Sequence, residues 1–205
     1  MAQIRCLTLF SGTHSVSKAL EASGVPYEEV TLDWAEPADL TMDILEFDPA
    51  IFKPGAFNLV WASPECTQYS RARTTGSEPR QLDTADSYVA KTLQVIDHLK
   101  PDVWVIENPE SGLLKTRPLM LLRPFCVADY CMYDTFYRKR TAFWSNIPFE
   151  LKTCGTGHGK CPYVLHGKHV AGLQESPQGK CRGMIPVPLL VSMIEQALPH
   201  LSSTG

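Results

Sequence analysis

Short apolar runs alternate with amphipathic stretches from Ile4 to Ile106. A short apolar run bounded by turn residues predicts a buried strand. The strands expected in this way are Ile4–Phe10, Tyr27–Leu32, Phe57–Ala62 and Val103–Ile106. Apolar residues at helical spacing predict helices over His14–Ala22, which Gly24 ends, and over Ala85–Leu99. Strands that alternate with helices imply an α/β fold, with a mostly parallel sheet covered by helices on both faces.

The pattern changes after Pro124, where two short apolar stretches, Cys126–Met132 and Ala142–Trp144, flank the basic turn Tyr137–Arg140. An antiparallel pair of strands at one edge of the sheet suits this arrangement. The sheet is therefore expected to be mixed. A final amphipathic helix is expected over Pro188–Leu198.

Three stretches lack a strong period. Met42–Leu45 is a short element whose type the sequence leaves open, and the polar stretch from Pro64 to Pro79 is expected to be a surface loop. Residues 152–182 are rich in Gly, His, Cys and Lys and predict an irregular insertion. Because 205 residues suffice for one well-packed core, we expect a single domain over residues 1–205 that carries this insertion.

Composition narrows the class of protein. Hydrophobic residues make up 44% of the chain and charged residues 20%, as in a soluble globular protein. The first residues lack a signal-peptide pattern and no stretch approaches the ~20 apolar residues of a membrane span. We therefore expect an intracellular protein without a membrane partner, cytoplasmic or, in a eukaryote, nuclear. Seven scattered cysteines argue against a disulfide framework in that setting. The net charge of -3 argues against nucleic-acid binding by bulk electrostatics and leaves room for a local basic patch.

Polar or turn residues end each of the four apolar strands. These ends are Phe10-Ser11-Gly12, Asp33-Trp34, Pro64-Glu65-Cys66 and Glu107-Asn108-Pro109. Ligands of an open parallel sheet bind at the carboxyl ends of the strands, so we expect these residues to converge on one crevice. A glycine turn lets a ligand approach the backbone, and an acidic residue can accept hydrogen bonds from both hydroxyls of a ribose. The pattern indicates a nucleoside-containing cofactor, and Trp34 either stacks on its adenine or covers the sheet edge.

From Cys6 to Asn146 the chain resembles the DNA cytosine-5 methyltransferase family. The segments similar to its motifs occur in the family's order: Leu7–Gly12 for the cofactor motif, Ala62–Ser70 for the Pro-Cys loop, Val105–Pro109 for the Glu-Asn motif and Tyr137–Thr141 for the paired arginines. The resemblance implies a Rossmann-like fold that depends on S-adenosylmethionine. It also implies that this cofactor is bound by Phe10, Gly12, Asp33, Trp34, Asp43 and Pro64.

The resemblance further implies four catalytic residues. Carbon 5 of cytosine is too weak a nucleophile to take a methyl group until a thiolate adds to carbon 6, and Cys66 is assigned that step. Glu107 is assigned the hydrogen bond or proton to ring nitrogen 3. Arg138 and Arg140 are assigned to lowering the pKa of the thiol, steadying the carbonyl oxygen of the base and holding a phosphate.

The substrate implied is cytosine in DNA, flipped out of the stack if the DNA is a duplex. Only about forty residues separate Asn146 from Pro186, too few for the family's usual target-recognition domain. DNA sequence is then read weakly, or a partner supplies specificity, or the substrate is not duplex DNA. Two alternatives stay open: cytosine methylation in RNA or a free nucleotide, and a non-catalytic, cofactor-binding accessory subunit, which the departures at Thr8, Glu65 and Thr67 suggest.

The insertion contains enough soft ligands for zinc, at spacings that match no standard zinc finger. The candidates are Cys154, His158, Cys161, His166, His169 and Cys181. A zinc ion could order a loop that has no core of its own. The alternative is that these are free surface residues.

Overall fold

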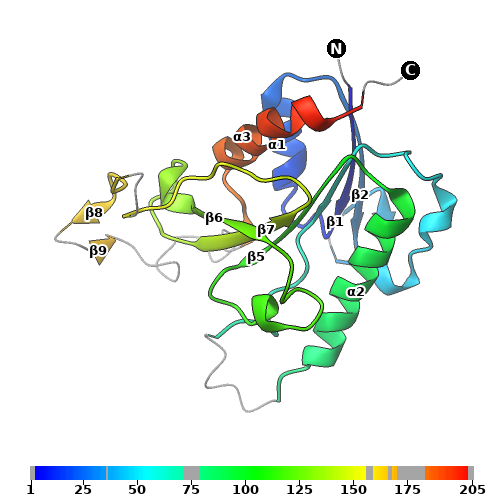
Figure 1. Cartoon of the computed structure of the whole chain (residues 1–205), viewed down its shortest axis with the longest axis horizontal. Coiled ribbons are helices and arrows are strands. Elements are labelled where there is room, and N and C mark those ends of the chain that lie inside the picture. Colours follow the sequence, from blue (N-terminus) through cyan, green and yellow to red (C-terminus); the bar gives the residue numbers. More distant parts are fainter. Residues whose placement is uncertain are drawn as a thin grey trace.

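A mixed sheet organises the chain (Figure 1). The computed structural model describes residues 3–35, 37–71, 79–155, 159–165, 168–169 and 183–202. Among these residues, seven strands form one sheet in the order β3-β2-β1-β4-β5-β7-β6. The strands are β1 (Ile4–Leu9), β2 (Tyr27–Asp33), β3 (Leu40–Thr41), β4 (Leu59–Ala62), β5 (Val103–Pro109), β6 (Phe125–Asp129) and β7 (Arg140–Ser145).

Strands β1 to β5 run parallel, and β7 runs in the opposite direction to its neighbours on both sides. β7 pairs antiparallel with β5, and β6 pairs antiparallel with β7. The mixed, mostly parallel sheet and its antiparallel edge are therefore confirmed. The reversal places the start of β7 beside the end of β5, where Thr141 is the register partner of Pro109.

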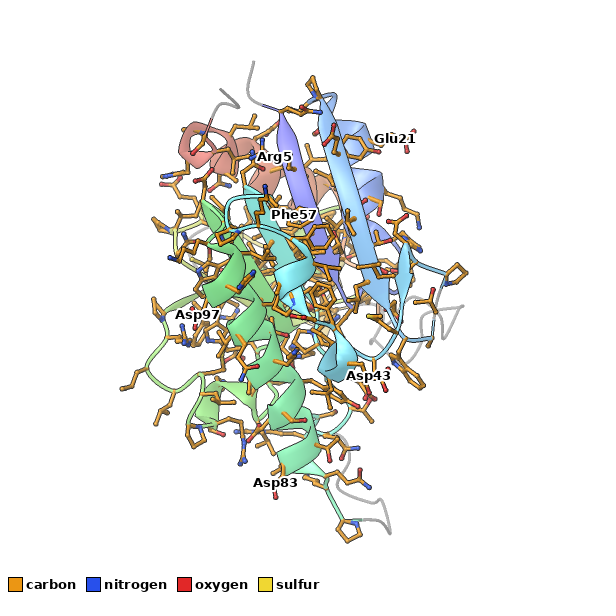
Figure 2. All side chains as sticks on the ribbon, turned by 90° about the vertical axis from the view of Figure 1, so that its right-hand side faces the viewer. Arg5, Glu21, Asp43, Phe57, Asp83 and Asp97 are labelled. Atoms are coloured by element: carbon orange, nitrogen blue, oxygen red, sulfur yellow. The ribbon has the colours of Figure 1, made fainter. Side chains whose placement is uncertain are left out.

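Side chains of one strand point alternately to the two faces of the sheet, and each face has its own helices. In β4, Leu59 and Trp61 pack with α1 (Ser15–Ser23) and α3 (Val187–Ala197), whereas Val60 and Ala62 pack with α2 (Leu82–Leu99). Figure 2 shows α2 in front of the sheet on the second of these faces. Helices thus cover both faces, as the strand and helix pattern predicts.

The helix ends follow local chemistry. α1 stops at Gly24, whose φ of 67° is left-handed and whose N–H donates to the Glu21 carbonyl, as the sequence predicts. α2 starts at Leu82, three residues before the predicted start at Ala85. Among the described residues, no helix is long and apolar enough to cross a membrane.

The structure corrects one strand. The predicted strand Cys126–Met132 is wrong at its end, because β6 stops at Asp129 and Tyr130–Met132 forms the 3-10 turn η4. The apolar character continues past this point, but the N–H of Tyr133 closes the turn on the Tyr130 carbonyl. Arg140, predicted in a turn, opens β7.

Short elements account for two weakly patterned stretches. Ile44–Glu46 is the 3-10 turn η1, capped by the side chain of Asp43, and Pro49–Ile51 is a second such turn, η2. Within the insertion, β8 (Val164–Leu165) and β9 (Lys168–His169) form an antiparallel pair.

Candidate active site

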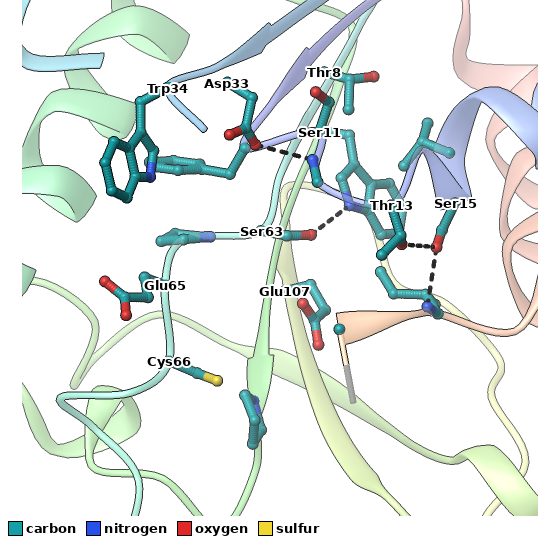
Figure 3. Close-up of a pocket in the computed structure, with 18 of the residues that line it drawn as sticks. Thr8, Ser11, Thr13, Ser15, Asp33, Trp34, Ser63, Glu65, Cys66 and Glu107 are labelled. Carbon is teal, nitrogen blue, oxygen red and sulfur yellow. Dashed lines mark hydrogen bonds between the residues drawn. The ribbon is translucent and has the colours of Figure 1, made fainter. Parts of the chain in front are cut away.

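A pocket of about 270 Å³ lies at the carboxyl ends of the parallel strands (Figure 3). Its lining includes residues from all four strand ends singled out in the sequence: Phe10, Ser11, Gly12, Asp33, Trp34, Pro64, Glu65, Cys66, Glu107 and Pro109. The segment before α3 adds Gly183 and Ile185. The Ile185 N–H donates to Ser15 Oγ at 3.2 Å, which fixes that segment to the start of α1.

The turn between β1 and α1 forms one wall. Phe10, Gly12 and His14 have φ values of 58°, 46° and 53°, a left-handed conformation that is unfavourable for residues with a Cβ. Gly12 adopts it without that penalty. Ser11 lies between Phe10 and Gly12, and its buried Oγ has no hydrogen-bond partner among the described residues. An unsatisfied buried hydroxyl on a pocket wall is available to a ligand.

Asp33 at the end of β2 is fixed by two backbone donors. Gly12 N–H donates to its Oδ2 at 2.9 Å, and Ala35 N–H donates to its Oδ1 at 2.9 Å. Each carboxylate oxygen accepts more than one hydrogen bond, so Asp33 can also bind hydroxyls. The indole of Trp34 beside it is 74% exposed and borders the pocket.

A smaller recess of about 60 Å³ adjoins this wall. Phe10, Asp33 and Trp34 line both spaces, and Asp43 and Tyr88 line the recess. Asp43 Oδ1 accepts the Leu45 N–H at 2.9 Å, which orients the carboxylate at the start of η1. A flat aromatic ring with an amino group suits this apolar space with an acid at its edge.

The loop after β4 carries Cys66. The buried Asn108 side chain in β5 donates from Nδ2 to the Pro64 carbonyl at 2.9 Å, tying the ends of two neighbouring strands together. Further along, the Tyr69 hydroxyl donates to Asp86 Oδ1 in α2 at 2.8 Å. Asp86 also pairs with Arg117. The thiol is thus on a loop held at both ends.

Glu107 faces Cys66 across the pocket (Figure 3). Its side chain is buried, and the Tyr130 hydroxyl donates to its Oε1 at 3.4 Å. Lys139 Nζ lies 3.7 Å from the same oxygen and 5.0 Å above the centre of the Tyr130 ring. A buried carboxylate with a cation and a hydroxyl donor is held in one orientation.

Opposing effects act on the pKa of the Cys66 thiol. Burial raises the pKa of Cys66, the positive charge of Lys139 lowers it, and the negative charge of Glu107 raises it. Burial is the largest of these effects, so the thiol is mainly protonated at neutral pH.

Comparison with known proteins places the chain in a family. No family model matches it. A protein of Frog virus 3 (isolate Goorha), described as a probable DNA (cytosine-5)-methyltransferase, is 33% identical to it over 217 residues, covering 94% of this chain and 99% of that protein. The chain belongs to the DNA (cytosine-5)-methyltransferase family.

A solved methyltransferase structure supports the fold. The Entamoeba histolytica methyltransferase EhMeth is 13% identical and superimposes with a TM-score of 0.54, covering 75% of this chain and 56% of that one. The Dnmt2 methyltransferase of S. pombe, 18% identical, has a TM-score of 0.49 and matches 72% of this chain and 51% of its own. The chain therefore spans about half the length of these structures. Its fold is the Rossmann-like methyltransferase fold expected from the sequence.

The arginines of the family's paired motif lie beside the pocket and do not line it. Arg138 Nε donates to Asp129 Oδ1 at 2.9 Å, and Arg140 Nη1 donates to Asp129 Oδ2 at 3.1 Å. The residue between them, Lys139, lines the pocket instead. Sequence reasoning missed Lys139, although successive side chains of an extended segment point in opposite directions.

The zinc candidates of this family member separate into two groups. Cys154, Cys161 and His169 lie together, and Cys131, which sequence reasoning did not include, joins them. His158, His166 and Cys181 lie outside the described residues.

Proposed function

We propose that this protein transfers a methyl group from S-adenosylmethionine to carbon 5 of cytosine in DNA, through a covalent intermediate on Cys66. The observation that carries the proposal is the position of Cys66 and Glu107 in one pocket with Asp33, Trp34 and Ser11. A thiol nucleophile, an acid and a nucleoside-binding wall are the groups that this reaction needs.

The proposed reaction starts at Cys66. Its thiolate sulfur bonds to carbon 6 of the cytosine, and the electron pair of the double bond between carbons 5 and 6 moves into the ring toward nitrogen 3. Glu107 hydrogen-bonds or protonates that nitrogen, so that the ring becomes an enamine nucleophilic at carbon 5. Lys139 favours the thiolate and orients Glu107.

Carbon 5 then takes the methyl group, and a base removes the proton from that carbon. The electrons of the broken carbon–hydrogen bond restore the ring double bond as the carbon–sulfur bond breaks, which frees Cys66. A proton given to nitrogen 3 returns to Glu107, so that the product is neutral.

The residues of the pocket fit S-adenosylmethionine. Bound there, the cofactor supplies an electrophilic methyl group on a sulfonium. Asp33 is suited to the ribose hydroxyls, Trp34 and Asp43 to the adenine, and the unsatisfied Ser11 hydroxyl to a polar group of the cofactor. Phe10, Gly12 and Pro64 line the same pocket and would contact the cofactor through its shape rather than through hydrogen bonds.

DNA is proposed as the substrate because the viral relative is described as a DNA (cytosine-5)-methyltransferase. A cytosine in a duplex has to leave the stack to reach Cys66. Arg138 keeps 41% of its side chain exposed while paired with Asp129, so it is open to a phosphate near the pocket. We propose that the short insertion or a partner protein recognises the DNA sequence around the target cytosine.

Trapping with 5-fluorocytosine tests the proposal. Fluorine at carbon 5 cannot leave as a proton, so the adduct with Cys66 persists in the presence of S-adenosylmethionine. We expect a covalent complex that mass spectrometry maps to Cys66 and that Cys66→Ser abolishes. Cys126, another half-buried free thiol, provides the matched control, and Cys126→Ser should still be trapped.

Parallel assays on different substrates distinguish DNA methylation from the alternative functions. Duplex DNA, denatured DNA, RNA and cytidine nucleotides are offered with radiolabelled cofactor. Label in RNA or nucleotides alone contradicts DNA as the substrate while leaving the nucleophile in place. Cofactor binding without transfer to any of them makes the chain a non-catalytic subunit.

A further inference from the structure

A cluster of thiols and an imidazole lies outside the pocket just described. Cys131 is in η4, Cys154 and Cys161 are on the segment after β7, and His169 is in β9. Their four ligand atoms all lie within 4.8 Å of one another. Three parts of the chain, η4, the segment after β7 and β9, thus bring four soft ligands to a single point.

The distances in this cluster match a tetrahedral site. His169 Nε2 lies 3.3 Å from the Cys131 sulfur, 3.4 Å from the Cys161 sulfur and 3.6 Å from the Cys154 sulfur. Bonds of about 2.3 Å from zinc to sulfur and about 2.0 to 2.1 Å from zinc to nitrogen, at a tetrahedral angle, separate sulfur and nitrogen by ~3.6 Å. All three observed separations lie within a few tenths of an ångström of that value.

Hydrogen bonding alone gives no account of the arrangement. One imidazole nitrogen donates or accepts a single hydrogen bond, yet three sulfurs surround Nε2 of His169. The three cysteines are free thiols and are only 1%, 7% and 5% exposed. Met132, Tyr163 and Val164 pack around them, so water is a poor alternative partner. A cation at the centre would be bound by all four groups at once.

We infer that Cys131, Cys154, Cys161 and His169 bind one structural zinc ion. Thiolate and imidazole ligands select zinc over the hard cations magnesium and calcium. Four protein ligands leave no open position, which is typical of a structural site rather than a catalytic one. Each thiol gives up its proton to solvent as its sulfur bonds to the ion.

The site would join the insertion to the edge of the sheet. Cys154 N–H donates to Asp129 Oδ2 at 2.8 Å, and Asp129 is the carboxylate that holds Arg138 and Arg140. An ion bound by Cys131 and Cys154 would therefore fix both sides of Asp129. The zinc ion would order the segment that takes the place of a target-recognition domain, and it does not depend on the proposed reaction.

Metal content and spectroscopy of the full-length protein test the inference. We expect one zinc ion per chain by mass spectrometry after exhaustive dialysis against metal-free buffer without chelator. Cobalt substitution should give tetrahedral d–d bands and thiolate-to-cobalt charge transfer. Folded protein that retains no zinc above the buffer background overturns the inference.

Variants test the ligand set. Cys131→Ser and Cys161→Ser should lose the stoichiometric zinc and the charge-transfer band, whereas Cys126→Ser and Cys181→Ser should retain both. Loss in Cys181→Ser together with retention in Cys161→Ser would show a different set of ligands and contradict the assignment.

Ligand variants can fail to fold, so zinc-edge X-ray absorption of the unaltered protein provides a second measurement. We expect three sulfurs at about 2.3 Å and one nitrogen at about 2.0 to 2.1 Å. A first shell made of oxygen and nitrogen alone would exclude this site.

Discussion

Lys139 connects the two reacting side chains of the proposed mechanism. Its ammonium lies 3.7 Å from Glu107 Oε1, and its charge lowers the pKa of the Cys66 thiol against the effect of burial. The two groups are coupled through this residue because both carry or develop negative charge beside it. Charge on Lys139 therefore favours the thiolate of Cys66, which is the attacking form in the proposed mechanism.

Lys139→Met should slow methyl transfer and shift its pH dependence. Removal of the cation raises the pKa of Cys66 further, so the thiolate fraction at neutral pH falls and the rate recovers only at more alkaline pH. We expect a loss of about tenfold at neutral pH, equivalent to one unit of pKa. Single-turnover rates against pH measure this shift.

Lys152→Met is the matched control. Lys152 lies 5.9 Å above the ring of Tyr133, in the same kind of cation–π contact, but it does not line the pocket. Identical pH profiles for the two variants would contradict the role of Lys139.

Asp33→Asn should weaken cofactor binding. Each oxygen of Asp33 accepts a backbone N–H, from Gly12 and from Ala35, so an amide group places its NH2 against one of these donors. A lost hydrogen bond and a distorted turn should raise the Kd for S-adenosylmethionine by about 10- to 100-fold. Isothermal titration calorimetry measures the change.

Asp39→Asn is the control on the same side of the sheet. One oxygen, Oδ2, accepts from both the N–H and the hydroxyl of Thr31, so the other can become an amide nitrogen without losing either bond. Cofactor affinity should stay at the level of the unaltered protein. An equal rise of the Kd for S-adenosylmethionine in both variants would mean that Asp33 affects binding only by stabilising β2.

At the scale of elements, β6 and β7 are joined by a buried carboxylate. Asp129 ends β6 with no exposed surface on its side chain, and it accepts hydrogen bonds from Arg138, Arg140 and the Cys154 N–H. The antiparallel edge of the sheet thus depends on one charge that three segments share.

Asp129→Asn should destabilise the fold by about 2 to 4 kcal/mol, because the amide cannot satisfy three sets of donors and leaves the arginines without a countercharge. Urea unfolding of the zinc-saturated protein measures this loss of stability.

Glu110→Gln is the control. It removes a more exposed carboxylate that pairs with Lys115 and Arg140, so it should lower the free energy of unfolding by about 0 to 1 kcal/mol. A difference between the variants of less than about 0.5 kcal/mol would contradict the role of Asp129.

Apolar periodicity predicts the long elements well and the short ones poorly. The four longer parallel strands, β1, β2, β4 and β5, and all three described helices occur where the sequence predicts them, because their burial is set by runs of several residues. β3 has only Leu40 and Thr41, too few residues for a period. The end of β6 depends on the Asp129 contacts, which are made by residues distant in sequence and invisible to a local pattern.

The candidate site shows the same division. The strand ends from Phe10 to Glu107 are recognisable from sequence because they follow apolar runs, and the fold brings them into one pocket. Lys139 and Cys131 are not recognisable, because their partners come from other parts of the chain. The paired arginines stand out by type, but their contacts with Asp129 depend on the return of the chain through β7.

At the scale of the whole molecule, segments from the beginning and the end of the described chain together form one side of the pocket. Ile185 and Ser15, joined by a hydrogen bond, are 170 residues apart, and α1 packs against α3 on the same face of the sheet. At about 5 to 20 residues per second, a ribosome needs roughly 10 to 35 s to make the residues between them. For that time the newborn α1 exposes the apolar face that α3 later covers, so we expect chaperones to bind the nascent chain until α3 has been made.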